Sequence, residues 1–196
     1  LESALLDKSK EFDSVIKMGR TQLQDAVPIR LGQEFHAYAS AIRRDIKRFD
    51  NAKEEIRCLN LGGTAIGTGL NVDVQYFHRV VKNMSTLTGE ELVQSYDMID
   101  ATQNLDSYAS ISGIVKNCGV NLSKMSNDLR LMSSGPRTGF GEINLPARQN
   151  GSSIMPGKVN PVIPEVVNQV AFNIIGNDVT ITMAAEAGQL ELNAFE

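Results

Sequence analysis

The stretch that decides the fold is residues 31–57, which read LGQEFHAYASAIRRDIKRFDNAKEEIR. Apolar side chains recur in it at a strict spacing of seven, with two further apolar residues between them: Phe35, Ile42, Phe49 and Ile56, with Ala39 and Ile46. Such a repeat, with charged residues on the other faces, is typical of a helix that packs lengthwise against another helix. The stretch therefore predicts one long helix and a fold built from long helices.

Working outward, the flanking sequence predicts further helices separated by turn-rich segments. We expect a first helix that ends near Met18 and Gly19, followed by a turn-rich connection over residues 20–30. The glycine-rich run at 61–71 cannot continue a helix, because each glycine costs about 1 kcal/mol there relative to alanine. We expect three further helices, over residues 74–84, from a cap at Asp100 to about Leu131, and over residues 162–185. Residues 135–160, between the last two of these helices, are expected to form a long loop. The prediction is an all-α fold, a long-helix bundle.

The expected last helix is apolar on more than one face. Its apolar positions are Val166, Val167, Val170, Ile174, Ile175 and Val179. A helix that is apolar all round is buried in a large core or between subunits. A single bundle of this size would not easily cover it, so we expect an oligomer.

The composition narrows the class of protein. The formal net charge is −4, and no block of basic residues suggests nucleic acid or an anionic membrane as a partner. No apolar run approaches the ~20 residues of a membrane span, and no signal peptide is visible. Cys58 and Cys118 lack metal-ligand spacing. We expect a cytoplasmic protein with no nucleic-acid or membrane partner and no metal or other cofactor.

The most informative stretch for chemistry is residues 151–161, which read GSSIMPGKVNP. A Gly-Ser-Ser turn leaves backbone N–H groups free to face an anion, Lys158 adds a positive charge and Asn160 a neutral donor. The two prolines stiffen the segment, because each has a locked φ. Hydroxyl, cation and amide groups therefore stand together in one loop next to a helix start.

Residues 151–161 strongly resemble the signature of the fumarase/aspartase superfamily, and further blocks resemble it in the same order. These blocks are residues 19–28, 31–35, the run ending at 67–71, and 127–130 leading to 134–137. The resemblance covers essentially the whole chain. It implies that residues 1–196 are the central helical domain of a homotetramer whose active sites are shared between three subunits. Both ends look cut, so we expect a fragment of a longer chain that lacks its N-terminal and C-terminal parts.

The resemblance also implies roles for individual residues. Members of the superfamily reversibly eliminate a group from a dicarboxylate to give fumarate, and removal of the proton beside a carboxylate requires a base and donors for the new negative charge. By resemblance, Ser152 is the catalytic base. Lys158, Asn160, Thr21 and Gln22 would hold the substrate carboxylates, and Ser153, Met155 and Glu165 would support the site.

One position favours the aspartase branch, which deaminates L-aspartate to fumarate and ammonia. Fumarases of this class carry a histidine after the threonine, usually linked to the glutamate that matches Glu165, whereas this chain has Gln22. Gln22 cannot carry a proton as imidazole does, but it can donate to a carboxylate. Residues 183–193 also resemble aspartases. A class II fumarate hydratase and a non-catalytic scaffold of the same fold remain as alternatives.

Overall fold

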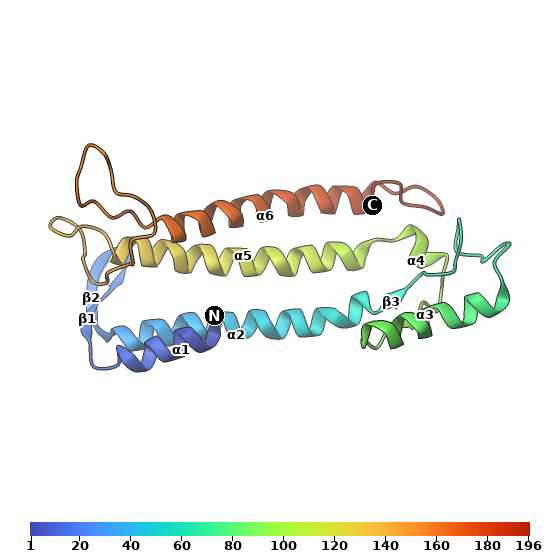
Figure 1. Cartoon of the computed structure of the whole chain (residues 1–196), viewed down its shortest axis with the longest axis horizontal. Helices are drawn as coiled ribbons and strands as arrows, with labels where there is room; N and C mark the ends of the chain where they lie inside the picture. The colour runs from blue at the N-terminus through green and yellow to red at the C-terminus, as the bar shows by residue number, and fades with distance from the viewer. The chain divides into compact units, whose positions relative to one another are not determined.

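The computed structural model describes all 196 residues and is dominated by long helices (Figure 1). The elements in chain order are α1 Glu2–Glu11, β1 Ile16–Thr21, β2 Gln24–Arg30, α2 Leu31–Ile56, β3 Cys58–Leu59, α3 Val74–Thr88, β4 Val93–Gln94, α4 Asp100–Gln103, α5 Asp106–Met132 and α6 Val162–Glu186. The strands form only two small two-stranded sheets. The predicted all-α fold is confirmed, as are the long helix from Leu31 and the last helix from Val162.

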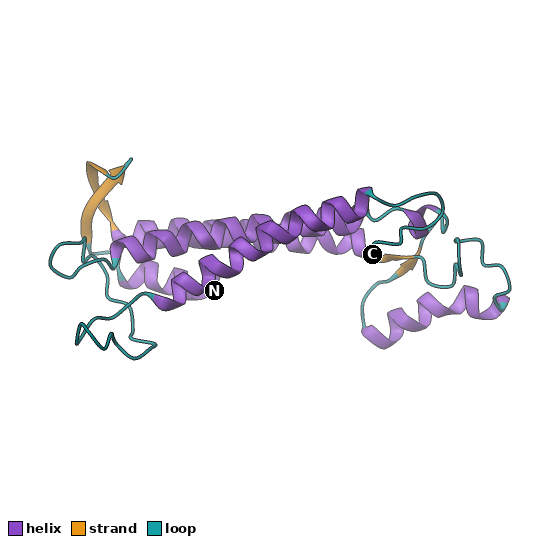
Figure 2. Ribbon diagram, turned by 90° about the horizontal axis from the view of Figure 1, so that it is seen from above, coloured by secondary structure: helices purple, strands orange, loops and turns teal.

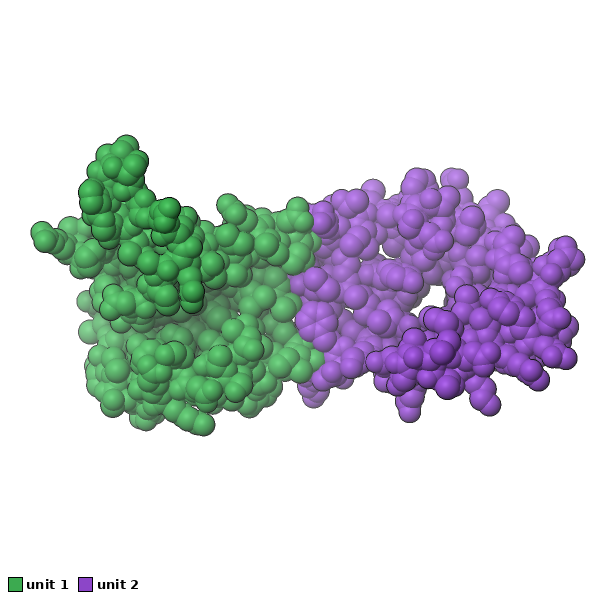
Figure 3. Space-filling view, in the orientation of Figure 1, with its two compact units in different colours: residues 1–46, 117–175 green, residues 47–116, 176–196 purple.

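The chain divides into two compact units, coloured separately in Figure 3. Unit 1 holds residues 1–46 and 117–175, and unit 2 holds residues 47–116 and 176–196. The three longest helices, α2, α5 and α6, each contribute one part to either unit. None of the helices combines the length and the hydropathy that a membrane span requires.

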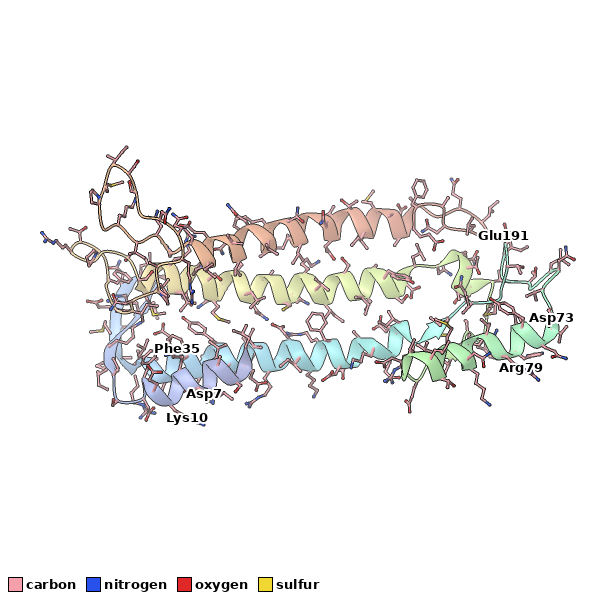
Figure 4. All side chains as sticks on the ribbon, viewed as in Figure 1. Asp7, Lys10, Phe35, Asp73, Arg79 and Glu191 are labelled. Carbon is pink, nitrogen blue, oxygen red and sulfur yellow. The ribbon has the colours of Figure 1, made fainter.

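The core of unit 1 forms where α1, the first half of α2 and the last half of α5 meet. Its buried apolar residues are Leu5, Leu31, Phe35, Tyr38, Ala39, Ile42, Met125 and Met132. The ring of Phe35 packs edge-on against Phe12 and Tyr38, with centroid distances of 5.2 and 5.8 Å, a geometry that aromatic pairs prefer. Figure 4 shows Phe35 on the side of α2 that faces α5, whereas Asp7 and Lys10 of α1 lie on the opposite, outer side. The first half of the predicted seam is therefore core.

A close approach between α1 and α2 explains why glycine follows Leu31. A Cβ at Gly32 would lie 2.3 Å from the carbonyl oxygen of Ser9, which no side chain can tolerate. In the available space the Ser9 hydroxyl donates to the Gly32 carbonyl at 2.7 Å, and the Gly32 N–H donates to the Phe12 carbonyl at 3.0 Å. The start of α2 is thereby fixed against the end of α1.

The predicted first helix and the turn-rich connection after it are wrong in detail. α1 ends at Glu11, and residues 16–30 form an antiparallel hairpin of β1 and β2, drawn in orange in Figure 2. A Cβ at Gly19 would lie 2.7 Å from the Val27 carbonyl oxygen, so the glycine that suggested a helix end instead permits strand pairing. The hairpin closes through Gln22 and Leu23, whose φ angles are 52° and 62°, as a two-residue primed turn requires.

Unit 2 contains a capped helix, α3, that runs further than predicted. The Asp73 side chain accepts from the N–H groups of Gln75 and Tyr76 at 2.8 and 3.0 Å, which satisfies the helix start. The helix continues past Met84 to Thr88 and ends at Gly89, whose φ of 73° is left-handed. Figure 4 labels Asp73 at one end of α3 and Arg79 along it.

The single helix predicted from Asp100 to Leu131 is two helices, α4 and α5. Asp97, and not Asp100, supplies the first cap, since its side chain accepts from the N–H groups of Ile99 and Asp100 at 3.0 and 3.1 Å. Asn104 is extended, with a ψ of 132°, and its amide donates to Asp100 Oδ1 at 2.6 Å. The buried Leu105 follows this break. The extended backbone at Asn104 therefore separates two helices that the apolar spacing joined.

Apolar side chains remain exposed on two long helices. The second half of the α2 seam is partly open, with Phe49 38% and Ile56 45% exposed. On α6, Phe172 and Val179 are 63% and 62% exposed, and Val166 and Val170 are also exposed. At 100° per residue, Val166 and Val170 lie on nearly the opposite side of α6 from Phe172 and Val179, so the exposed apolar residues do not form a single stripe.

Candidate active site

The loop between α5 and α6, residues 133–161, carries most of the predicted site. Its first half folds back onto the end of α5, because the N–H groups of Glu142 and Ile143 donate to the Met132 carbonyl at 2.8 and 3.4 Å. An inner turn forms where the Gly141 N–H donates to the Ser134 carbonyl at 2.8 Å. The loop lies at the same end of α5 as the hairpin of β1 and β2 (Figures 1 and 2).

A groove of about 650 Å³ lies between the end of α5 and the last part of this loop. Its lining residues are Arg130, Ser133, Ser134, Gly135, Pro136, Ile143, Asn144, Leu145, Pro156, Gly157, Lys158, Val159, Asn160 and Pro161. Two of the predicted carboxylate binders, Lys158 and Asn160, are among them. Together with Arg130 they place two cations and one amide in a concave site, an arrangement suited to a small anion.

Ser152 stands in a turn of its own within the loop. Its Oγ accepts from the backbone N–H groups of Ile154 and Met155 at 3.2 and 3.1 Å. Hydrogen bonds donated to an oxygen favour its negatively charged form. Met155 contributes through its backbone, and its side chain is half exposed. Ser153 is exposed beside it.

The predicted site residues are only partly brought together. Ser152 does not line the groove that holds Lys158 and Asn160. Thr21 and Gln22 lie at the tip of the hairpin, are both exposed, and do not line the groove either. Ser152 and the hairpin tip therefore lie outside the lining of the groove, although Gly151, directly before Ser152, closely approaches the Lys158 carbonyl.

Glu165 pairs with an arginine in this chain. It lies in the first turn of α6, and its Oε1 is 3.8 Å from Arg130 Nη2, with both side chains 41% exposed. Beneath this pair the buried Asn168 joins α6 to α5: its amide donates to Ser123 Oγ at 2.8 Å and to Asn127 Oδ1 at 3.1 Å. The start of α6, directly after Asn160, is thereby held against α5.

An ion-pair cluster that the sequence analysis missed joins three segments of unit 1. We call it the Glu142 cluster, and it consists of Lys17, Arg20, Glu34 and Glu142. Lys17 Nζ lies 2.8 Å from both Glu34 Oε2 and Glu142 Oε2, and Arg20 Nη1 donates to Glu142 Oε1 at 2.6 Å. Arg20 also lies over the ring of Phe140, 4.1 Å from its centroid. Glu142 is 122 positions from Arg20, so no local spacing could have revealed the pair.

Charge pairing governs the ionisation of this cluster. Burial alone raises the pKa of the Glu142 carboxyl, but its contacts with Lys17 and Arg20 outweigh burial and lower the pKa below its ordinary value. Burial likewise lowers the pKa of the Lys17 ammonium, yet Glu142 and Glu34 bring it above its ordinary value. Both groups are therefore held in their charged forms.

The structure shows no group of three or more His, Cys, Asp or Glu side chains placed to hold a metal ion. The polar groups that converge on the groove are instead cations and amides, together with the hydroxyls of Ser133 and Ser134. Such a set favours an oxyanion, because lysine and arginine side chains carry positive charge and only donate hydrogen bonds. The chemistry open to this groove is the binding of a small anion.

The family model and two curated proteins that match this chain are described as lyases. A family model described as Lyase matches residues 1–176. The aspartate ammonia-lyase of Bacillus subtilis (strain 168) is 58% identical over the whole chain, which covers 41% of that protein. The aspartate ammonia-lyase of Escherichia coli (strain K12) is 54% identical over 96% of the chain and 40% of its own length. The chain spans about two-fifths of the length of the curated relatives it matches.

Solved structures agree on the fold. The fumarate lyase:delta crystallin from Brucella melitensis bound to cobalt is 55% identical to this chain, with a TM-score of 0.94. The match covers the whole of this chain and 42% of the Brucella melitensis chain. The recombinant class II fumarase from Schistosoma mansoni has a TM-score of 0.93 and 38% identity, over 98% of this chain and 43% of its own. The likeness thus extends across the groove, the serine turn and the hairpin.

The Glu142 cluster should make the free energy of unfolding depend on pH in the acidic range. Because the folded-state pKa of Glu142 is lowered, its stabilisation is present above the ordinary pKa and is lost as the pH falls through the folded-state pKa. Glu142→Gln should lower the free energy of unfolding by about 2–4 kcal/mol at pH 7, and this difference should shrink below about pH 4.5. Urea titrations from pH 7 to pH 3 measure both quantities. Glu11→Gln, in the exposed Lys8 pair, is the matched control, and a pH-independent difference for Glu142→Gln would contradict the assignment.

Proposed function

Since the chain belongs to the fumarase/aspartase superfamily of lyases, we propose that the complete protein is an aspartate ammonia-lyase, which converts L-aspartate reversibly to fumarate and ammonia. The observation that carries this proposal is the turn at Ser152, whose Oγ accepts two backbone hydrogen bonds in the loop that also places Lys158 and Asn160 on a groove. A hydroxyl so held, in the same loop that lines an anion-binding groove, is suited to act as a base beside a carboxylate.

In the proposed reaction, the Ser152 oxyanion takes a proton from Cβ of L-aspartate. The electron pair moves into the adjacent carboxylate, which becomes a doubly charged aci-carboxylate. That charge then returns to form the carbon–carbon double bond, the bond between Cα and nitrogen breaks, and ammonia leaves. Donors aimed at the aci-carboxylate lower the barrier most, because its charge is larger in the transition state than in the substrate.

Lys158 and Asn160 are the proposed donors for this charge. Lys158 supplies a full positive charge at the groove and Asn160 an amide N–H, and both are held by a segment that ends on α6 at Val162. Thr21 and Gln22, at the hairpin tip, are the proposed contacts for the second carboxylate. Ser153, Met155 and Glu165 are proposed to support the site, Met155 through the N–H that it donates to Ser152.

A class II fumarate hydratase is the second candidate, favoured by the likeness to the Schistosoma mansoni fumarase. Against it, the histidine that fumarases of this class carry is replaced by Gln22, which cannot relay a proton as imidazole does, and Glu165 is 3.8 Å from Arg130. Parallel assays of the complete protein on L-aspartate and L-malate, following fumarate absorbance, decide between them. Turnover of malate alone would support the hydratase, and turnover of neither would support a non-catalytic scaffold.

The proposal also covers assembly and context. Residues 1–196 are proposed to be the central helical domain of a longer cytoplasmic chain that forms a homotetramer, with active sites shared between subunits and no nucleic-acid or membrane partner. Two observations support this. The groove that holds Lys158 and Asn160 is not lined by Ser152, Thr21 or Gln22, and apolar side chains such as Phe172 and Val179 are exposed along α6.

Loss of the proposed base should abolish most turnover. In the complete protein, Ser152→Ala should lower kcat by about 10²–10⁴-fold, the range for loss of a general base, while L-aspartate binding changes less. Ser153→Ala removes an equivalent hydroxyl from the neighbouring exposed position and should be milder. Near-normal turnover in Ser152→Ala, measured by fumarate release, would exclude this serine as the base.

Loss of the groove cation should affect binding and turnover together. Lys158→Ala should lower kcat/KM by about 10²–10³-fold, because the charge that Lys158 meets grows in the transition state. Lys10→Ala, on the outer side of α1 (Figure 4), is the control and should leave kcat and KM unchanged. Unaltered values of kcat and KM in Lys158→Ala would show that this side chain points into solvent and does not bind the substrate.

The exposed face of α6 should be an assembly surface. We expect the complete protein to sediment as a tetramer at micromolar concentration, and Phe172→Asp to dissociate it, because a charge buried without a partner costs several kcal/mol. Phe172→Leu keeps the face apolar and should leave the tetramer intact. A monomer for the unmodified protein, or a tetramer for Phe172→Asp, would contradict the assignment.

A further inference from the structure

The turn at the tip of the hairpin is in an unfavourable conformation. Gln22 and Leu23 have φ angles of 52° and 62°, where residues with a side chain are uncommon and Gly, Asn or Asp is usual. Backbone strain of this kind persists only where the surrounding structure holds it, and it concentrates at functional positions. The hairpin must therefore be braced from outside the turn.

The contacts that hold the hairpin are made by Arg20, which precedes Thr21 in β1. Arg20, next to Thr21, donates to Glu142 Oε1 at 2.6 Å, lies 3.4 Å from Asp25 Oδ1 across the hairpin, and covers the ring of Phe140 at 4.1 Å. Two of these three partners, Glu142 and Phe140, belong to the loop between α5 and α6. A guanidinium with one planar face on a ring and one edge on a carboxylate has little freedom to move.

Glu142 is also the residue through which the hairpin reaches α2. Its other carboxylate oxygen lies 2.8 Å from Lys17 Nζ, and the same ammonium lies 2.8 Å from Glu34 Oε2 of α2. The Lys17 side chain is 9% exposed and that of Glu142 14%. These charges are largely shielded from water, so the geometry of one constrains the others.

We propose that Glu142 is a positioning residue, which braces the strained Gln22–Leu23 turn and the adjacent Thr21 by tying them to the loop that carries Ser152, Lys158 and Asn160. The turn and the loop are then ordered together, and loosening one loosens the other. Glu142 does not touch the substrate, and acts only through Arg20 and Lys17. Its effect on turnover rests on the proposed function, in which Thr21 and Gln22 bind a carboxylate.

Hydrogen exchange tests the brace without requiring turnover. In the complete protein, Glu142→Gln should raise amide exchange by about fivefold or more in both residues 16–30 and residues 133–145, as local opening becomes easier, and leave α3 unchanged. Glu142→Asp keeps the charge and should restore protection in part. Faster exchange in the loop alone, with the hairpin as protected as in the unmodified protein, would overturn the proposal.

Kinetics test the consequence for the substrate. Glu142→Gln should raise KM for L-aspartate about tenfold and change kcat by less than about threefold, the pattern for loss of binding that is equal in ground and transition states. Arg20→Lys, which keeps the charge but loses the planar contact with Phe140, should show the same pattern more weakly and serves where Glu142→Gln does not fold. Glu11→Gln, in the exposed Lys8 pair, should change neither constant.

The outcomes separate the two proposals. A fall in kcat with unchanged KM, or no kinetic change in Glu142→Gln, would overturn the positioning role while aspartate deamination stands. If the unmodified protein does not deaminate L-aspartate, the proposed function fails, and the exchange experiment still decides whether Glu142 orders the turn and the loop together.

Discussion

The burial of the Glu142 carboxylate is the constraint on which the functional end of unit 1 depends. A carboxylate that is largely removed from water must have positive partners, because its unpaired charge would cost several kcal/mol. Lys17 and Arg20 supply them from β1, at 2.8 and 2.6 Å. The pairing fixes the first half of a long loop that has few apolar residues to bury, and it fixes the hairpin at the same time.

Polar side chains also set how α5 lies against its neighbours within each unit. In unit 1 the amide of Asn121 donates to both oxygens of the buried Asp45 of α2 at 2.9 Å, and the buried Asn168 of α6 donates to Ser123 Oγ. In unit 2 the buried Asp178 of α6 accepts from Ser112 at 2.8 Å and from Lys116 at 2.5 Å. Apolar contacts tolerate sliding of one helix along another, whereas these pairs lose their hydrogen bonds if the register changes.

The predicted groups are carried by two segments of unit 1, the loop between α5 and α6 and the hairpin of β1 and β2. Lys158 and Asn160 share a groove, Ser152 occupies its own turn, and Thr21 and Gln22 are at the hairpin tip. Each is held by a different local structure: the start of α6, two backbone hydrogen bonds and a braced turn. Geometry held to about an ångström, which catalysis requires, depends on rigid local supports of this kind.

The sequence by itself determined the long helices, since the seven-residue spacing from Phe35 to Ile56 and the apolar run from Val162 are local patterns that only a helix satisfies. It also pointed to residues 151–161, because hydroxyl, cation and amide groups stand together there.

The sequence by itself misassigned residues 16–30, where Gly19 resembled a helix end but provides the space that strand pairing with Val27 needs. It joined α4 to α5, because apolar spacing does not register the break at Asn104. Only the tertiary structure decided that Glu142 meets Arg20 and Lys17, and that Lys158 lines a groove with Arg130 while Ser152 does not. The physical reason is that helix formation depends on neighbours a few positions apart, whereas ion pairs and grooves depend on distances in space between residues that the chain keeps far apart.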